Sequence, residues 1–149
     1  MKIIVLAGGL STERDVSLSS AAGICRTLVE KGHDAFLLDV FMGLENAPEN
    51  LEDVFTLPDH GLEIVKNIST EEPDLEAVKA SRPDQSDCFF GPNVIELCRL
   101  ADITFLGLHG GEGENGKLQA SFDLLGIKYT GPDSLGCAVA QRCCKADLP

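Results

Sequence analysis

The residues best suited to chemistry lie in a glycine-rich segment between positions 109 and 116. Its sequence, His109-Gly110-Gly111-Glu112-Gly113-Glu114-Asn115-Gly116, combines one imidazole, two carboxylates and four glycines. A neutral imidazole can hydrogen-bond to a ligand carboxylate, and a protonated one can neutralise it. A segment this rich in glycine costs backbone entropy on folding, so we expect its backbone to approach another group closely.

A second glycine-containing segment lies near the start of the chain, with the sequence Gly8-Gly9-Leu10-Ser11-Thr12-Glu13-Arg14. It lacks the third glycine of a dinucleotide fingerprint and the Gly-Lys-Ser/Thr of a phosphate-binding P-loop. A helix that begins here can receive an anion at its free N–H groups, and the Glu13 carboxylate can hold an ammonium group. The simpler interpretation is a capped helix stabilised by an acidic first turn, and the segment alone favours it.

Apolar runs precede both segments and are typical of buried parallel strands, one over residues 3–7 and one over 103–108. Helical spacing over 16–29 predicts a helix with Ser11 or Thr12 as its N-cap, Asp15 in its first turn and Gly32 as its stop. The remaining patterns predict a strand over 35–41, an exposed strand over 62–66, helices over 92–100 and 117–125, a strand over 127–130, and a last helix capped by Asp133 or Ser134.

The order of these elements predicts one three-layer α/β domain over residues 1–149, with a mostly parallel sheet and a right-handed crossover. In open sheets of this kind, ligands bind beyond the carboxyl ends of the strands. We therefore expect the two glycine segments to share one edge of the sheet, with Glu13, His109 and Glu114 around a common pocket. A carboxylate on one side and an imidazole on the other would suit an amino acid zwitterion.

The charge is strongly acidic and unevenly distributed. The chain carries a net charge of −12, and residues 41–87 hold twelve of its 24 acidic residues. This predicts a solvated, irregular acidic insert over 42–91 and excludes a nucleic-acid backbone as partner. The chain has no apolar run long enough to span a membrane. Six cysteines without a Cys-x-x-Cys pair, and no leader, predict reduced thiols in a cytoplasmic protein.

Other chemistries find weaker support in the residues. A metal site built on His109, Glu112 and Glu114 would have a single nitrogen ligand, whereas common zinc sites use more histidine or cysteine. Nucleophilic catalysis lacks a Gly-x-Ser-x-Gly sequence and a cysteine with an evident histidine partner. A metal-dependent hydrolase that uses the 109–116 segment nevertheless stays open as an alternative.

Three motifs carry a resemblance to a known family, and they stand in this chain as Gly8-Gly9-Leu10-Ser11-Thr12-Glu13-Arg14-Asp15-Val16-Ser17, His109 through Ala120, and Tyr129-Thr130-Gly131. In this order and spacing they resemble the N-terminal domain of D-alanine–D-alanine ligases. The resemblance covers nearly the whole chain apart from residues 42–91 and the tail at 140–149. It implies the Rossmann-like pre-ATP-grasp domain of that family.

The resemblance also implies a reaction and a site. In the family, ATP and Mg²⁺ phosphorylate one D-alanine to a D-alanyl phosphate, and a second D-alanine attacks it to give a peptidoglycan precursor. By correspondence, Glu13 would act as the catalytic and substrate-binding contact to the ammonium of the first D-alanine, and His109 would lie near its carboxylate. Val16 and Ser17 would line the pocket and Glu114 would support it. The family's N-terminal domain also contributes to a homodimer.

The departures from the family concern its remaining parts. The ATP-grasp and C-terminal domains are absent, and Gln141-Arg142-Cys143 stands where the family has Met-Asp-Lys. A shifted reading frame or a natural truncation would explain that tail. We expect this chain alone to bind no cofactor and to make no dipeptide. The alternative is a non-catalytic truncated homologue that serves as a small-ligand or dimerisation module. The choice of D-alanine, D-lactate or D-serine as second substrate depends on regions outside this chain.

Overall fold

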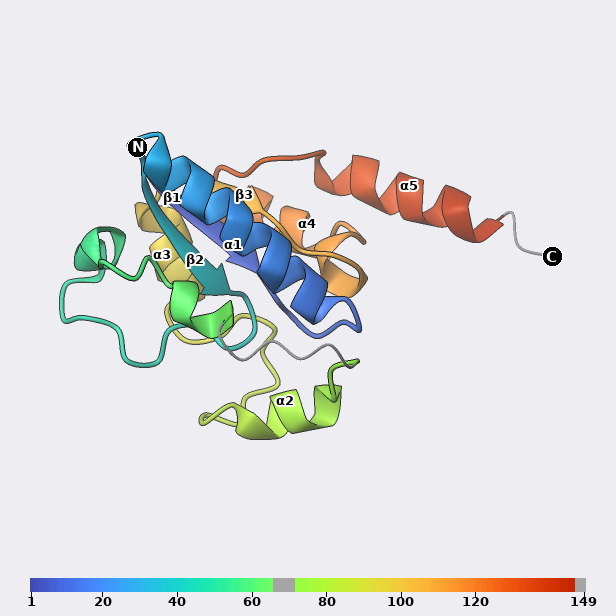
Figure 1. Ribbon diagram of the computed structural model, residues 1–149. Helices are drawn as coiled ribbons and strands as arrows, with labels where there is room; N and C mark the ends of the chain where they lie inside the picture. The colour runs from blue at the N-terminus through green and yellow to red at the C-terminus, as the bar shows by residue number, and fades with distance from the viewer. Residues whose placement is uncertain (66–71, 147–149) are drawn as a thin grey trace.

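Three parallel strands form the centre of the molecule. The computed structural model describes residues 1–65 and 72–146, and its strands are β1 (Lys2–Ala7), β2 (Asp34–Asp39) and β3 (Ile103–Leu106). The strand order is β2-β1-β3, with β1 in the middle (Figure 1). Each residue of β1 from Ile3 to Ala7 is buried, which confirms the predicted central strand. Because β1 and β3 are parallel neighbours, the loops that follow them leave the same edge of the sheet.

Helices cover both faces of the sheet and complete the predicted three layers. Helix α1 (Arg14–Glu30) packs on the face that presents Ile3, Val5 and Ala7. Helices α3 (Val94–Leu100) and α4 (Lys117–Leu125) pack on the face that presents Ile4 and Leu6. Successive strand side chains point to opposite faces, so one apolar run supplies both cores. The bounds of α4 match the prediction for residues 117–125.

The ends of α1 partly agree with the sequence analysis. Asp15 lies in its first turn, as predicted, and Gly32 adopts a φ of +83° just beyond its end. The prediction of Ser11 or Thr12 as N-cap was wrong, because Glu13 occupies that position. The Ser11 hydroxyl instead donates to the backbone oxygen of His109, so it joins two loops rather than capping its own helix.

Two predicted strands are shorter than expected, and a third does not form. Strand β2 ends at Asp39. The Asp39 carboxylate accepts hydrogen bonds from the backbone N–H groups of Phe41 (2.9 Å) and Met42 (3.1 Å), which turns the chain directly after the strand. Strand β3 ends at Leu106 rather than at residue 108. The segment at 127–130 forms one parallel bridge to β3, since the Thr130 hydroxyl replaces a backbone oxygen as acceptor for the Leu106 N–H.

The acidic insert contains more structure than predicted. It includes the 3₁₀ helices η1 (Leu51–Thr56) and η2 (Leu62–Val65), and the helix α2 (Leu75–Ser81). The prediction of an exposed strand over 62–66 was wrong for residues 62–65, and Lys66 lies outside the described residues. Leu62 and Val65, one 3₁₀ turn apart, both pack on the cluster beneath α1. Within η1, Val54 and Phe55 are buried in the main core.

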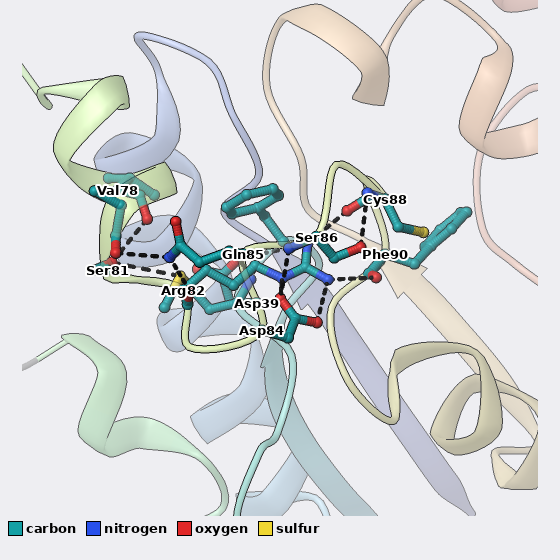
Figure 2. Close-up of polar contacts among 12 residues, drawn as sticks. Asp39, Val78, Ser81, Arg82, Asp84, Gln85, Ser86, Cys88 and Phe90 are labelled. Atoms are coloured by element: carbon teal, nitrogen blue, oxygen red, sulfur yellow. Dashed lines mark hydrogen bonds and ion pairs between the residues drawn. The ribbon is translucent and has the colours of Figure 1, made fainter.

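A buried arginine organises the end of the insert. Arg82 is 2% exposed and donates to the backbone oxygens of Cys88 (2.5 Å) and Phe90 (3.2 Å), as Figure 2 shows. Its guanidinium also pairs with Asp84 and lies 4.7 Å from the centre of the Phe41 ring. The hydrogen bond from Arg82 lowers the pKa of the Asp84 carboxyl. Residues 82–90 are thus tied to the chain that follows β2.

The last helix, α5 (Ser134–Ala146), extends away from the sheet (Figure 1). Its start agrees with the prediction, because the Asp133 carboxylate accepts a 2.7 Å hydrogen bond from the Gly136 N–H. Across residues 1–65 and 72–146, each helix falls short of the length and apolarity that crossing a membrane requires.

Candidate functional site

The two glycine loops meet at the carboxyl edge of the sheet, as predicted. The Ser11 hydroxyl donates a 2.8 Å hydrogen bond to the His109 backbone oxygen. A Cβ atom placed on Gly110 would lie 2.8 Å from a carboxylate oxygen of Glu13. Gly110 also has a φ of +69°, which side-chain-bearing residues rarely adopt. Glycine at this position therefore lets the Glu13 carboxylate rest directly against the loop that carries His109.

Ser17 lies beneath this junction and holds its two sides together. It is fully buried, and its hydroxyl accepts a 3.0 Å hydrogen bond from the Gly8 N–H. The same hydroxyl donates a 2.7 Å hydrogen bond to the backbone oxygen of Gly107. Both bonds stabilise the loops, so Ser17 forms the floor of the site and not a surface open to a ligand.

A buried ion pair between Arg14 and Asp39 fixes the first loop, and the sequence analysis missed it. One guanidinium nitrogen of Arg14 pairs with Asp39, and another donates a 2.8 Å hydrogen bond to the Gly9 backbone oxygen. Asp39 approaches so closely that a Cβ atom on Gly8 would lie 2.7 Å from its carboxylate. The available signal was an acid at the end of a strand and an arginine directly after Glu13.

The groups above this floor are open to a ligand. Glu13 is exposed, and the described residues offer its carboxylate no hydrogen bond or ion pair. Val16 is 62% exposed on the first turn of α1, while His109 is half-buried. The Ser20 hydroxyl lies 3.4 Å from Nε2 of the His109 ring. The site is thus an open shelf with an acid at one end, an apolar side chain beside it and an imidazole at the other end.

Glu114 lies apart from this shelf. It follows the 3₁₀ helix η3 (Gly111–Gly113) and lines a cavity of about 650 Å³ together with Gln119 and Cys137, but without Glu13 or His109. The Gln119 amide donates a 2.9 Å hydrogen bond to the Gly113 backbone oxygen. Burial, with nearby acidic groups, raises the pKa of the Cys137 thiol. The structure therefore unites Glu13, Val16 and His109, and it places Glu114 on the next surface along the loop.

Glu112 has a structural role within its own loop. Its carboxylate accepts hydrogen bonds from the Asn115 amide (2.9 Å) and the Lys117 ammonium (3.1 Å). The bond from Asn115 is the main reason that the pKa of Glu112 is lowered. Among the residues that the structure describes, no three histidine, cysteine or acidic side chains gather as a metal site. The metal-site interpretation of His109, Glu112 and Glu114 therefore finds no support in the geometry.

Comparison with known proteins agrees with this geometry. Residues 2–132 match the family model described as D-ala D-ala ligase N-terminus. A D-alanine–D-alanine ligase of Lacticaseibacillus casei is 47% identical over 142 residues, which cover 95% of this chain and 39% of the relative. A D-alanine–D-alanine ligase of Pediococcus pentosaceus is 49% identical over 146 residues, covering 95% of this chain and 40% of the relative. The chain thus spans about two fifths of the length of these curated relatives.

Solved structures show the same similarity. The D-alanine–D-alanine ligase from Coxiella burnetii superposes with a TM-score of 0.52 at 25% identity, covering 93% of this chain and 38% of that one. The VanG D-Ala:D-Ser ligase from Enterococcus faecalis superposes with a TM-score of 0.51 at 26% identity, covering 92% of this chain and 37% of that one. One of these two relatives is thus named a D-alanine–D-alanine ligase and the other a D-Ala:D-Ser ligase.

Proposed function

Because this chain belongs to the D-ala D-ala ligase N-terminus family, we propose that it is the amino-acid-binding domain of an ATP-dependent D-alanine–D-alanine ligase. The observation that carries the proposal is the shelf on which the Glu13 carboxylate rests against the loop of His109. An amino acid zwitterion needs an anion for its ammonium group and a donor for its carboxylate. The shelf offers both at the edge of a parallel sheet, where ligands of such folds bind.

Each residue of the shelf has a proposed role toward the first D-alanine. Glu13 accepts hydrogen bonds from the ammonium group, a charge-assisted contact that is stronger than a neutral one. His109 lies beside the carboxylate, and Val16 contacts the substrate methyl group. Ser17 keeps the two loops in register from below. Glu114 supports the site indirectly, through the loop that it shares with His109.

The chemical step requires partners that we assign to the rest of a family-length ligase. ATP would transfer its γ-phosphoryl group to the carboxylate of the first D-alanine, and the amine of the second would displace phosphate. We propose that ATP and Mg²⁺ bind outside this domain, in the remaining part of a family-length ligase. The product would be a peptidoglycan precursor made in the cytoplasm, where ATP is available. The domain alone would bind D-alanine without joining it.

A chimera tests this proposal. Residues 2–132 would replace the matching segment of the Lacticaseibacillus casei ligase, which is 47% identical over the aligned region. We expect ATP hydrolysis that depends on D-alanine, with D-alanyl-D-alanine as product. In the chimera, Glu13→Gln should raise the KM for the first D-alanine at least about tenfold, because a charged hydrogen bond is lost.

The matched control lies at the opposite end of the same helix. Glu30 is exposed at the last position of α1, so Glu30→Gln in the chimera should leave both kinetic constants unchanged. A folded chimera without ligase activity would contradict the proposal. Unchanged kinetics in the Glu13→Gln chimera would contradict the role given to Glu13.

A further inference from the structure

One stripe of helix α1 faces the loop that follows β3. Glu13 lies against Gly110, Ser17 donates to the Gly107 backbone oxygen, and Ser20 reaches the ring of His109. Glu13 is the N-cap of α1, and Ser17 and Ser20 follow it by four and then three residues, so the three side chains lie along one side of the helix. The sequence analysis accounted for Glu13 and Ser17, whereas Ser20 had no assigned role.

The hydroxyl proton of Ser20 is directed to the helix backbone. Its Oγ atom donates to the backbone oxygen of Val16 at 2.9 Å and lies 3.1 Å from that of Ser17. A serine hydroxyl has one proton and two lone pairs. With the proton directed to the helix, the oxygen can only accept a hydrogen bond from His109. The ring nitrogen that faces Ser20, 3.4 Å away, is Nε2.

We propose that Ser20 is a positioning residue that selects the protonation pattern of His109. By accepting a hydrogen bond from Nε2, it favours the neutral tautomer of His109 that is protonated on Nε2 and unprotonated on Nδ1. The partner of one ring nitrogen decides the state of the other. The separation of 3.4 Å is long for such a bond, and hydrogen bonds to catalytic groups are often long when no ligand is bound. The Ser11 bond fixes the backbone of His109 at the start of its loop.

This assignment has a consequence for the ligand, and the consequence rests on the proposed function. Nδ1 is the ring nitrogen that remains available to the substrate. In the neutral ring it presents a lone pair, which can only accept a hydrogen bond. In the protonated ring it presents an N–H group, which can donate to a carboxylate while Ser20 retains the bond to Nε2. The carboxylate of the first D-alanine would therefore be bound by the imidazolium form of His109.

Nitrogen NMR of the imidazole rings tests the assignment without any ligand. The chain has three histidines, and His109→Gln identifies the signals of the third ring. In the ¹⁵N-histidine-labelled 149-residue chain at a pH where the ring is neutral, we expect Nε2 of His109 to give the protonated signal and Nδ1 the unprotonated one. Ser20→Ala should bring both nitrogen shifts toward the average of two exchanging forms, with loss of the slowly exchanging Nε2 proton.

Two control variants separate positioning from stability. Ser20→Thr retains a hydroxyl and should restore the wild-type ring signals, and Ser19→Ala changes an exposed neighbour and should leave them unchanged. The amide spectrum reports whether each variant is folded. A proton on Nδ1 in the wild type, or ring signals unaffected by Ser20→Ala, would overturn the proposal. D-alanine added afterwards tests the proposed function separately, because the ring assignment is made in its absence.

Discussion

The carboxyl edge of the sheet and the acidic insert are both built from loops, yet they are stabilised in different ways. At the edge, the side chains of Ser11 and Ser17 bind the backbone of the loop that follows β3, and Arg14 fixes its own loop through Gly9 and Asp39. In the insert, Arg82 binds the backbone of its own segment (Figure 2). The edge is thus held from beneath, which leaves the Glu13 carboxylate above it for a ligand. The difference is that side chains join the two edge loops to each other from beneath, whereas the insert is held by contacts within its own segment and by the burial of Val54 and Phe55 in the core.

The largest expected effect concerns the ion pair that holds the edge. Asp39→Asn removes the charge facing Arg14, which is 9% exposed. An unpaired buried charge costs about 3–5 kcal/mol, so the free energy of unfolding measured in urea should fall by that amount. Asp34→Asn, at the exposed start of the same strand, is the control. A loss below about 1 kcal/mol would mean that the pair does not fix the edge.

A smaller effect is expected from the arginine of the insert. Arg82→Leu leaves the backbone oxygens of Cys88 and Phe90 without their donor, which costs about 2–3 kcal/mol. Hydrogen exchange should accelerate over residues 83–90 and stay unchanged over 8–17. Lys79→Met, on the exposed face of α2, should change neither segment. Equal acceleration in both segments would contradict the separation of the two regions.

The junction between the two edge loops is expected to contribute less still. Ser17→Ala leaves the Gly8 N–H and the Gly107 backbone oxygen without their shared partner, at a cost of about 1–2 kcal/mol. The amide of Gly8 should lose its protection from exchange, while the amides of residues 83–90 keep theirs. Ser19→Ala on the solvent side of the same helix is the control. A protected Gly8 amide in Ser17→Ala would show that the hydroxyl does not join the loops.

The smallest expected effect is a pH-dependent change in stability, and it comes from Cys25 in the core beneath α1. Burial raises the pKa of the Cys25 thiol from 9.0 to about 11. The unfolded chain therefore loses this proton before the folded chain does, so stability is retained below about pH 9 and decreases as pH rises toward 11. At pH 9.5, ionisation of Cys25 in the unfolded chain should lower the free energy of unfolding by about 1 kcal/mol. In urea unfolding, Cys25→Ala should show a smaller decrease in the free energy of unfolding between pH 8 and 9.5 than the wild type. An equal decrease in both proteins would show that Cys25 is not its cause.

The sequence predicted the regular elements of the fold because their signals are local. The apolar run at 3–7, the helical spacing of α1 and the bounds of α4 depend on neighbouring residues and the alternation of faces. The insert was mispredicted because its acidic composition indicates a solvated segment, although a few of its side chains are buried. Val54 and Phe55 are buried by distant elements, and Arg82 is buried through contacts with the chain after β2.

The site was predictable to a similar extent. Parallel strands and glycine loops indicated that Glu13 and His109 share one edge, and the structure confirms this arrangement. The direction of each side chain within a loop could not be predicted from the spacing of residues in the sequence. Glu114 points to another cavity because η3 turns the chain between it and His109. The ion pair of Arg14 with Asp39 joins residues 25 positions apart. The sequence shows an acid at a strand end and an arginine after Glu13, but their spacing does not say that the two side chains meet.

Titration of the 149-residue chain with D-alanine, followed by amide NMR, tests most directly whether Glu13 and His109 form one amino-acid site. We predict saturable shifts confined to residues 9–17 and 107–111, weaker shifts with L-alanine, and loss of the response in both Glu13→Gln and His109→Gln. Glu30→Gln should respond like the wild type. Shifts around Cys137 and Gln119 instead, or a full response in either shelf variant, would contradict the site.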